Sequence, residues 1–264
     1  MVEKYPNLTL DVEDDGLARL TLSRPDDANS ADLALAKDFS DAARQLADDD
    51  RVRAVLLTGE GKMFCGGGDV KSFAAETDLG PKLREITTHL HSGVSRLVRL
   101  DAPVVAAVQG SAAGAGLGLA MAADLVLAGE SAKFVMAYTG IGLSPDGAST
   151  YFLPRLVGAR RALELTLTNR VLSAAEALDW GLVNTVVPDD ELSTAAENLA
   201  RRLSAGPTKS FGASKRLLRD SWSASLETQM ESESEELAAA GHRADGVEGI
   251  AAFVEKRRPD FTGR

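Results

Sequence analysis

Cysteine is nearly absent from this sequence, and histidine is scarce. Cys65 is the single cysteine, so no disulfide can form within the chain. The three histidines, His89, His91 and His242, do not have the spacing of a zinc site, and we expect no metal centre. We expect Cys65 to be a small buried residue and not a nucleophile.

Long apolar runs are missing as well. No stretch approaches the ~18 consecutive apolar residues of a membrane-spanning helix, and residues 1–16 lack the apolar core of a signal peptide. We therefore expect a cytoplasmic protein with no membrane partner. The net charge of −10 repels nucleic acid at long range, so we expect no nucleic-acid partner. An anionic ligand would have to be held by local basic groups and backbone amides.

Hydrophobic patterns alternate between strand and helix over most of the chain. Residues 8–25 predict two alternating strands around an Asp-Gly turn, and residues 30–49 predict an amphipathic helix. Further apolar strands are predicted at 52–59, 103–110, 125–130 and 183–187. From about Asp189 onward every segment is helical in pattern. The expectation is an α/β layered fold, with a core over 1–200 and a helical C-terminal subdomain over 201–264.

Two glycine-rich loops interrupt this pattern, "CGGGD" at 65–69 and "AAGAG" at 112–116. Without side chains, each loop can bring backbone N–H groups close to a ligand, and the second loop opens a helix. Two such amides could form an oxyanion hole, although close packing of two backbones explains the same composition. The glycine spacing after residue 114 does not fit a dinucleotide-binding fingerprint. Neither Ser144 nor Ser149 lies in the Gly-x-Ser-x-Gly of a serine-hydrolase elbow.

An isolated carboxylate, Asp146, stands in "GLSPDGAST" at 142–150, in a stretch that is otherwise poor in acids. Ser144, Pro145 and Asp146 are typical of the N-cap and first two residues of a helix, where a carboxylate interacts well with the free amides. The alternative is a reactive carboxylate that exchanges a proton with a ligand. The local pattern leaves both interpretations open.

Six segments together resemble the crotonase (enoyl-CoA hydratase/isomerase) family. In chain order they are "SRPDDANS", "GEGKMFCGGGDVKSF", "APVVAAVQGSAAGAGLGLAMAADLVLAGESAKF", "GLSPDGASTYFLPRLVG", "LSAAEALDWGLVNTVV" and "AAFVEKRRPDFTG". The resemblance spans nearly the whole chain. It implies a crotonase-like spiral of ββα units with a C-terminal helical trimerisation subdomain, assembled as a homotrimer or homohexamer. It also implies an acyl-CoA thioester as ligand, so that coenzyme A enters as part of the substrate and no separate cofactor is needed.

By position, the resemblance assigns the oxyanion donors to the backbone amides of Gly68 and Ala115. The carbonyl of Gly66 matches the family's contact to the adenine of coenzyme A. Two further pairs match the adenosine-phosphate edge and a C-terminal contact often lent by a neighbouring subunit, namely Arg24 with Ala28 and Phe253 with Lys256. The helical stretch 83–97 is expected to wall the acyl pocket.

The reaction that the resemblance implies depends on which acids are present. The family's hydratases use two glutamates to add water, and the matching positions here hold Gly118 and Tyr138, so hydration by that mechanism is not expected. Asp146 stands where family isomerases place a catalytic aspartate. We therefore expect an isomerase that shifts a proton through a thioester enolate, on an epoxyphenylacetyl-CoA or 3-enoyl-CoA type of substrate.

Other functions stay open. In aryl-CoA dehalogenases of the family, an aspartate at the place of Asp146 attacks the ring and a histidine activates water. His91 lies at the matching distance and Tyr138 replaces a ring-contacting tryptophan, whereas Gly68 replaces an expected aromatic. A partly exposed helix position beside His89 explains His91 without catalysis. An inactive acyl-CoA-binding scaffold would need Asp146 to be a helix cap alone.

Overall fold

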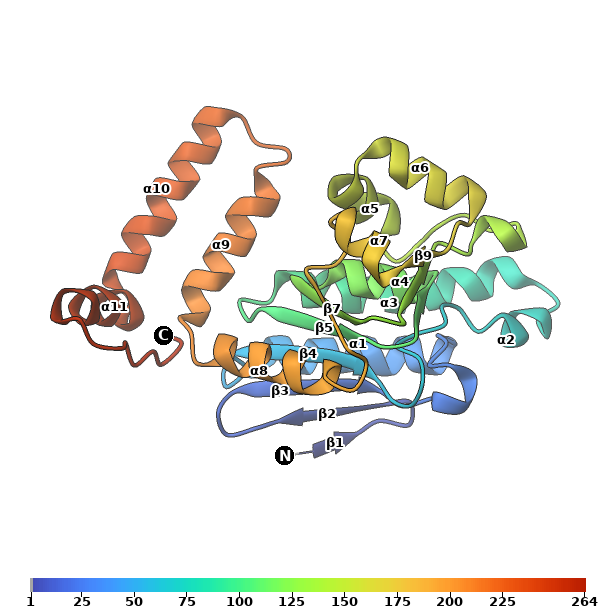
Figure 1. The fold of residues 1–264 in the computed structure, drawn as a ribbon, viewed down its shortest axis with the longest axis horizontal. Helices are drawn as coiled ribbons and strands as arrows, with labels where there is room; N and C mark the ends of the chain where they lie inside the picture. Colours follow the sequence, from blue (N-terminus) through green and yellow to red (C-terminus); the bar gives the residue numbers. More distant parts are fainter. Residues whose placement is uncertain (1) are drawn as a thin grey trace.

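The computed structural model describes residues 2–264, whose ribbon is shown in Figure 1. Within these residues a seven-stranded sheet has the order β1-β2-β3-β4-β5-β7-β10. Its strands are β1 (Val2–Lys4), β2 (Leu8–Val12), β3 (Leu17–Leu22), β4 (Ala54–Gly59), β5 (Val104–Val108), β7 (Leu125–Gly129) and β10 (Thr185–Val187). The pairs β1–β2 and β2–β3 are antiparallel, and every later pair is parallel. The predicted hairpin, helices and apolar strands are confirmed.

Both faces of the parallel strands are buried, which explains why these strands are apolar without alternation. On β4, Val55 and Leu57 belong to the core beneath α1 (Leu33–Asp48) and α3 (Leu79–Arg99). Ala54 and Leu56 point the other way, into a second apolar cluster closed by α8 (Leu192–Ser204). The sheet is thus enclosed between helical layers.

A second, three-stranded sheet stands beside the first within the described residues. It consists of β6 (Ser111–Ala113), β8 (Lys133–Val135) and β9 (Leu172–Ser173). The short helices of this half are α2 (Val70–Ala74), α4 (Ala115–Ala122), α5 (Ser149–Val157), α6 (Ala159–Thr168) and α7 (Ala174–Asp179), with 3-10 turns η1 (Pro25–Asp27) and η2 (Thr139–Ile141). The sequence patterns did not predict these three short strands.

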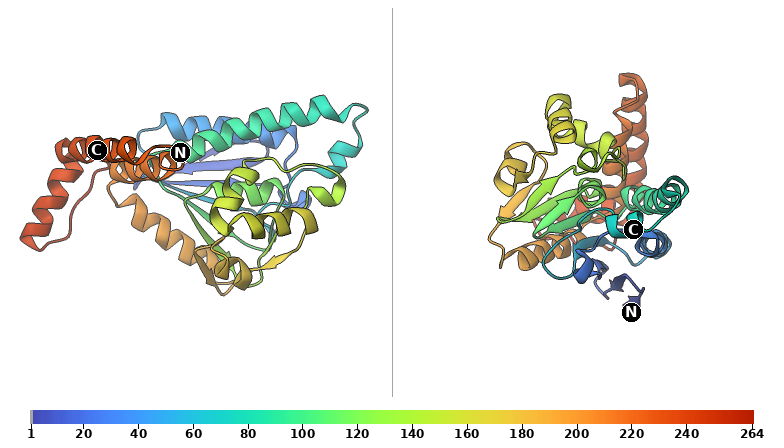
Figure 2. Two further views of the ribbon diagram at one scale, coloured as in Figure 1. Left: turned by 90° about the horizontal axis from the view of Figure 1, so that it is seen from above. Right: turned by 90° about the vertical axis from the view of Figure 1, so that its right-hand side faces the viewer.

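Three C-terminal helices project from the body of the molecule: α9 (Thr208–Asp220), α10 (Leu226–His242) and α11 (Ala244–Glu255). Figure 2 shows the same projection from above. The boundary expected after residue 200 falls inside α8, which packs on the sheet, so the projecting part begins at α9. No helix of residues 2–264 is both long enough and apolar enough to cross a membrane.

Ion pairs join α9 to the core. Asp101 contacts Lys209 and Arg216, and Asp124 contacts Lys215 and Arg219. Burial lowers the pKa of Lys215, although the carboxylate of Asp124 opposes that shift. The base of the projecting helices is therefore attached through charged side chains as well as through the chain itself.

The helix start expected at Ser144 to Asp146 is wrong. Helix α5 begins at Ser149, and no side chain caps its first amides. Gly147 and Ala148 both have left-handed backbone conformations, with φ of 59° and 62°, which cannot continue a right-handed helix. Asp146 consequently lies in the loop before α5, and its carboxylate is not a helix cap.

Candidate active site

The two glycine-rich loops lie against one another at one edge of the main sheet. They follow β4 and β5, which are parallel neighbours, so both loops leave the sheet at the same edge. A side chain at Gly116 would collide with the carbonyl oxygen of Cys65, and one at Gly67 would stand 2.9 Å from the carbonyl oxygen of Ala113. The close packing that the glycines predicted is confirmed.

This packing brings one residue of each loop to the same cavity. Gly68 and Ala115 both line a cavity of about 480 Å³. Ala115 is the first residue of α4, so its N–H has no acceptor within the helix. Among residues 2–264 neither N–H has a protein acceptor. The arrangement offers two donors and a helix N-terminus to an oxygen atom in the cavity.

An aromatic ring packs against Gly68. A Cβ built on Gly68 would stand 2.8 Å from ring carbons of Phe73, a buried residue of α2. Phe73 therefore occupies space next to the glycine that a side chain at position 68 would need. The sequence patterns did not single out Phe73, because it lies five residues beyond the glycine and nothing in its spacing marks it.

Helix α3 supplies a wall of the cavity, as predicted for residues 83–97, although its lining residues end at His91. Its apolar contributions are Leu83, Ile86 and Leu90, and its polar ones are Arg84, Thr87, Thr88 and His91. The side chains repeat at helical spacing, so one face of α3 looks into the cavity. Leu143 and Ser144 close another side. A ligand in the cavity would meet apolar side chains together with polar groups from α3.

Asp146 is the one carboxylate among the described residues that line the cavity. Its side chain is 23% exposed, and its Oδ1 accepts a short hydrogen bond from the hydroxyl of Tyr138. Burial, and then the nearby charge of Asp146, raise the pKa of the Tyr138 phenol above its usual value. Tyr138 therefore remains a neutral hydrogen-bond donor to a carboxylate.

His91 also lies in the cavity, next to Asp146. Its Nε2 is 3.9 Å from Oδ2 of Asp146, and it accepts a hydrogen bond from the backbone N–H of Gly147 at 3.1 Å. The imidazole is half exposed. His91 therefore lies next to Asp146. Its hydrogen bond, however, is with the backbone of Gly147 and not with the carboxylate.

Gly118 has a structural reason to be glycine. A Cβ there would stand 2.8 Å from the carbonyl oxygen of Gly147 and 3.1 Å from Oγ of Ser149. The loop that carries Asp146 consequently packs directly on α4. A glutamate at this position would displace that loop.

Comparison with known proteins decides the family. The sequence pattern of the enoyl-CoA hydratase/isomerase family matches residues 13–264. The chain belongs to this family, which is also called the crotonase family. Its fold is the crotonase fold, as the resemblance implied.

Several members of the enoyl-CoA hydratase/isomerase family are similar along nearly their whole length. A 1,2-epoxyphenylacetyl-CoA isomerase of Escherichia coli is 40% identical, with 94% of this chain and 96% of the relative covered. A 4-chlorobenzoyl coenzyme A dehalogenase of Arthrobacter is 36% identical over 92% and 88%. The crystal structure of an enoyl-CoA hydratase from Bacillus anthracis superposes with a TM-score of 0.92 at 32% identity, covering 98% of this chain and 100% of the other. These names include three reactions, so similarity alone does not select one.

The residues that match the family's adenosine contacts lie together outside the acyl cavity. The N–H of Gly66 donates to the carbonyl of Ala28 at 2.8 Å. Arg24 contacts three carboxylates, those of Asp27, Asp32 and Asp69. The positive charge of the Arg24 guanidinium is thus already balanced by these carboxylates. Asp69 also caps α2, since its Oδ1 accepts a hydrogen bond from the N–H of Ser72.

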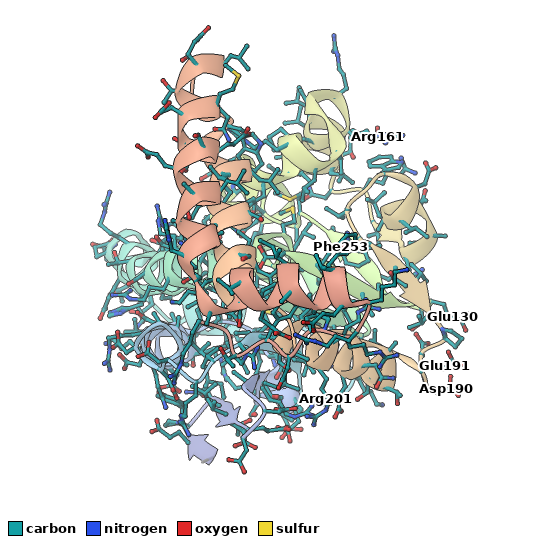
Figure 3. All side chains as sticks on the ribbon, turned by 90° about the vertical axis from the view of Figure 1, so that its left-hand side faces the viewer. Glu130, Arg161, Asp190, Glu191, Arg201 and Phe253 are labelled. Carbon is teal, nitrogen blue, oxygen red and sulfur yellow. The ribbon has the colours of Figure 1, made fainter. Side chains whose placement is uncertain are left out.

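Phe253 and Lys256 lie far from the cavity of their own chain. Phe253 lies in the last turn of α11 and Lys256 directly follows the helix, at the opposite end of the molecule from α2 (Figure 1). Figure 3, which faces the projecting helices, labels Phe253 on α11, and this side chain is 85% exposed. Neither residue lines the cavity of its own chain.

Residues 2–264 contain no group of three or more His, Cys, Asp or Glu side chains placed to hold a metal ion. Cys65 is fully buried, as predicted, and its Sγ donates to the carbonyl of Asn29. Burial raises the pKa of this thiol to about 11. Cys65 is therefore a packing residue at neutral pH.

Proposed function

We propose that this chain is an acyl-CoA isomerase that moves a proton through a thioester enolate. The observation that carries the proposal is the position of Asp146, which shares one cavity with the amides of Gly68 and Ala115. A substrate carbonyl held by the two N–H groups would place its acidic carbon within reach of a single carboxylate. One base and one oxyanion hole suffice for a proton shift.

The reaction needs no group from outside the chain and its substrate. Asp146 takes a proton from carbon, and the electron pair of that C–H bond moves onto the thioester oxygen. The amides of Gly68 and Ala115 stabilise the negative charge there by several kcal/mol, of the order of ~3 kcal/mol for each well-placed donor. Asp146 then returns the proton to a different carbon. A 3-enoyl-CoA would yield its 2-enoyl isomer, and an epoxyphenylacetyl-CoA would undergo ring opening.

Gly118 and Tyr138 argue against hydration. A hydratase of the family pattern needs a second carboxylate, and Gly118 leaves no space for one beside Gly147. Dehalogenation is the second candidate, because Nε2 of His91 lies 3.9 Å from Asp146. Against it stands the hydrogen bond from Gly147, which uses the lone pair that would activate water.

A panel of thioesters tests these alternatives. The chain is mixed with 3-enoyl-CoA, crotonyl-CoA, epoxyphenylacetyl-CoA and 4-chlorobenzoyl-CoA, and the products are followed by absorbance and mass. An isomer keeps the mass of its substrate, a hydration product gains one water, and a dehalogenation product exchanges chloride for hydroxyl. Asp146→Asn should lower isomerisation by at least about 100-fold while the thioester still binds. Unchanged turnover in this variant would leave the protein a binding scaffold or give the base role to another residue.

We also propose that the chain self-associates as a homotrimer or homohexamer through its projecting helices. These helices expose large apolar side chains that one copy leaves uncovered, namely Leu226, Leu237, Val247, Ile250, Phe253 and Val254. Such a surface favours burial against another copy. Phe253 and Lys256 would then reach coenzyme A bound next to Arg24, Ala28 and Gly66 of a neighbour. Sedimentation at micromolar concentration tests this, and a monomer would contradict it.

A further inference from the structure

The two oxygens of Asp146 have different surroundings. Oδ1 accepts the hydroxyl hydrogen of Tyr138. Oδ2 faces Nε2 of His91 at 3.9 Å, but that nitrogen accepts the N–H of Gly147 and offers no hydrogen to the carboxylate. One oxygen is therefore held by a donor, and no donor among the described residues 2–264 reaches the other.

The backbone holds Tyr138 in this orientation. Its N–H donates to the carbonyl of Met136, and its own carbonyl accepts the N–H groups of Ile141 and Leu143, each at 3.1 Å. The preceding residue, Ala137, has a left-handed φ of 62°, which turns the chain between β8 and η2. Non-glycine residues adopt this conformation at a cost, and such positions concentrate at functional sites.

We propose that Tyr138 is a positioning residue for the proton transfer, and that Oδ2 of Asp146 is the atom that takes and returns the proton. This inference rests on the proposed function, since it needs Asp146 to be the base. The hydroxyl of Tyr138 fixes the plane of the carboxylate by holding Oδ1. Oδ2 is then presented to the substrate in a single orientation.

Tyr138 keeps its own proton throughout. In the first step a C–H bond of the substrate breaks, an O–H bond forms at Oδ2, and the electron pair moves to the thioester oxygen. In the second step the O–H bond at Oδ2 breaks and a new C–H bond forms. The phenol remains neutral because burial and Asp146 keep it protonated.

Tyr138→Phe removes the hydroxyl and keeps the ring. Without the donor, Oδ1 of Asp146 loses its hydrogen bond from the phenol, so the acid limb of the kcat profile should move to higher pH. The maximal kcat should fall about tenfold while KM changes less than about threefold, because the thioester contacts remain. The other charged or titratable groups that line the cavity are His91 and Arg84. Measuring both profiles in a His91→Gln background removes the imidazole from the comparison, and the guanidinium of an arginine stays charged throughout.

Tyr5→Phe is the matched control. Tyr5 also donates its hydroxyl, to Oε1 of Gln45 at 2.8 Å, and does not line the cavity. It should leave the pH profile in place. If Tyr138→Phe does not fold, the hydrogen bond is tested instead by carbon-13 NMR of protein labelled at the Cζ atoms of its tyrosines. Asp146→Asn should then shift the Tyr138 signal and leave those of Tyr5 and Tyr151 unchanged.

A double variant tests the positioning role of Tyr138 separately from the role of Asp146 as the base. If Tyr138 acts through Asp146, adding Tyr138→Phe to Asp146→Asn should cause no further loss of rate. A further loss, or a Tyr138→Phe profile that superposes on the wild type, overturns the positioning role while Asp146 remains the base. Wild-type turnover in Asp146→Asn instead overturns the proposed function itself.

Discussion

Nε2 of His91 accepts the backbone N–H of Gly147, and this bond joins helix α3 to the loop that carries Asp146. A ring nitrogen that accepts a hydrogen bond carries no proton, so the neutral imidazole has its hydrogen on Nδ1. The same nitrogen is the atom of His91 that faces Oδ2 of Asp146. His91 therefore holds the loop beside the carboxylate and does not donate to it.

We predict that an acceptor at position 91 matters more than an imidazole. His91→Ala should lower kcat/KM for isomerisation about tenfold, because the loop loses its attachment to α3. His91→Gln, whose amide oxygen can accept the same N–H, should retain most of the activity. Nitrogen-15 spectra of the wild type should show the hydrogen on Nδ1 at neutral pH. A covalent aryl ester on Asp146 after mixing His91→Ala with 4-chlorobenzoyl-CoA would instead identify His91 as the base of a hydrolase.

Gly118 gives a second test of the same loop. Gly118→Ala places a Cβ against the carbonyl of Gly147 and should lower the free energy of unfolding by about 1–3 kcal/mol, with a loss of isomerisation. Gly241→Ala in α10 is the control. A Cβ there meets no atom within 4 Å, and the change should leave stability equal or higher by up to about 1 kcal/mol. Thermal and denaturant unfolding measure both.

Gly118→Glu tests whether a glutamate at this position restores hydration. Gly118→Glu should not produce measurable hydration of crotonyl-CoA, because the new side chain displaces the loop before it can act as a base. Hydration at a rate comparable with that of a dedicated hydratase would show that the loop adapts and that Gly118 does not exclude this reaction.

Most of the fold was predictable because burial on both faces leaves a clear mark in the sequence. The apolar runs that became β4 and β5 have no polar face, and the amphipathic spacing of residues 30–49 fits one side of a buried sheet. Short strands such as β9 are a different case. Their two or three residues pair through tertiary contacts, and no period can be recognised over that length.

The candidate site was predictable where glycine marked it. The loops at 65–69 and 112–116 meet because their glycines allow two backbones to touch. The start of α5 could not be predicted from the sequence. Ser144 and Pro145 match the pattern of a helix N-terminus, and no local pattern indicates the left-handed conformation of Ala148. The hydrogen bond between His91 and Gly147 joins residues that are far apart in the chain, so local pattern could not reveal it.

Acid should loosen the projecting helices. Burial alone would raise the pKa of Asp101, but contacts with Lys209 and Arg216 outweigh it and hold the pKa below its usual value. Hydrogen bonds from Arg216 and Arg243 likewise lower the pKa of Glu236 on α10. A lowered folded-state pKa contributes stability above the unfolded-state value, and this contribution is lost as pH falls through the folded-state value.

We therefore predict that the attachment of α9 and α10 weakens between about pH 5 and pH 3. Hydrogen exchange of the α9 amides should accelerate in that window before exchange of β4 and β5 does. Asp101→Asn should reduce the pH dependence, because its side chain no longer titrates. Equal acceleration in sheet and helices would mean that the projecting part does not loosen separately.

Ala148 supplies the last prediction, which concerns backbone strain at the site. Its φ of 62° costs an alanine roughly 1–2 kcal/mol relative to a right-handed conformation, whereas glycine adopts it freely. Ala148→Gly gains this relief but also makes the unfolded chain more flexible, so the free energy of unfolding should stay equal or rise by up to about 1 kcal/mol. The same change at Ala238, within helix α10, should lower it by about 1 kcal/mol. Opposite signs for the two variants in denaturant unfolding would support strain at Ala148. An equal loss in both would mean that the methyl group of Ala148 stabilises the turn before α5 by more than its conformation costs.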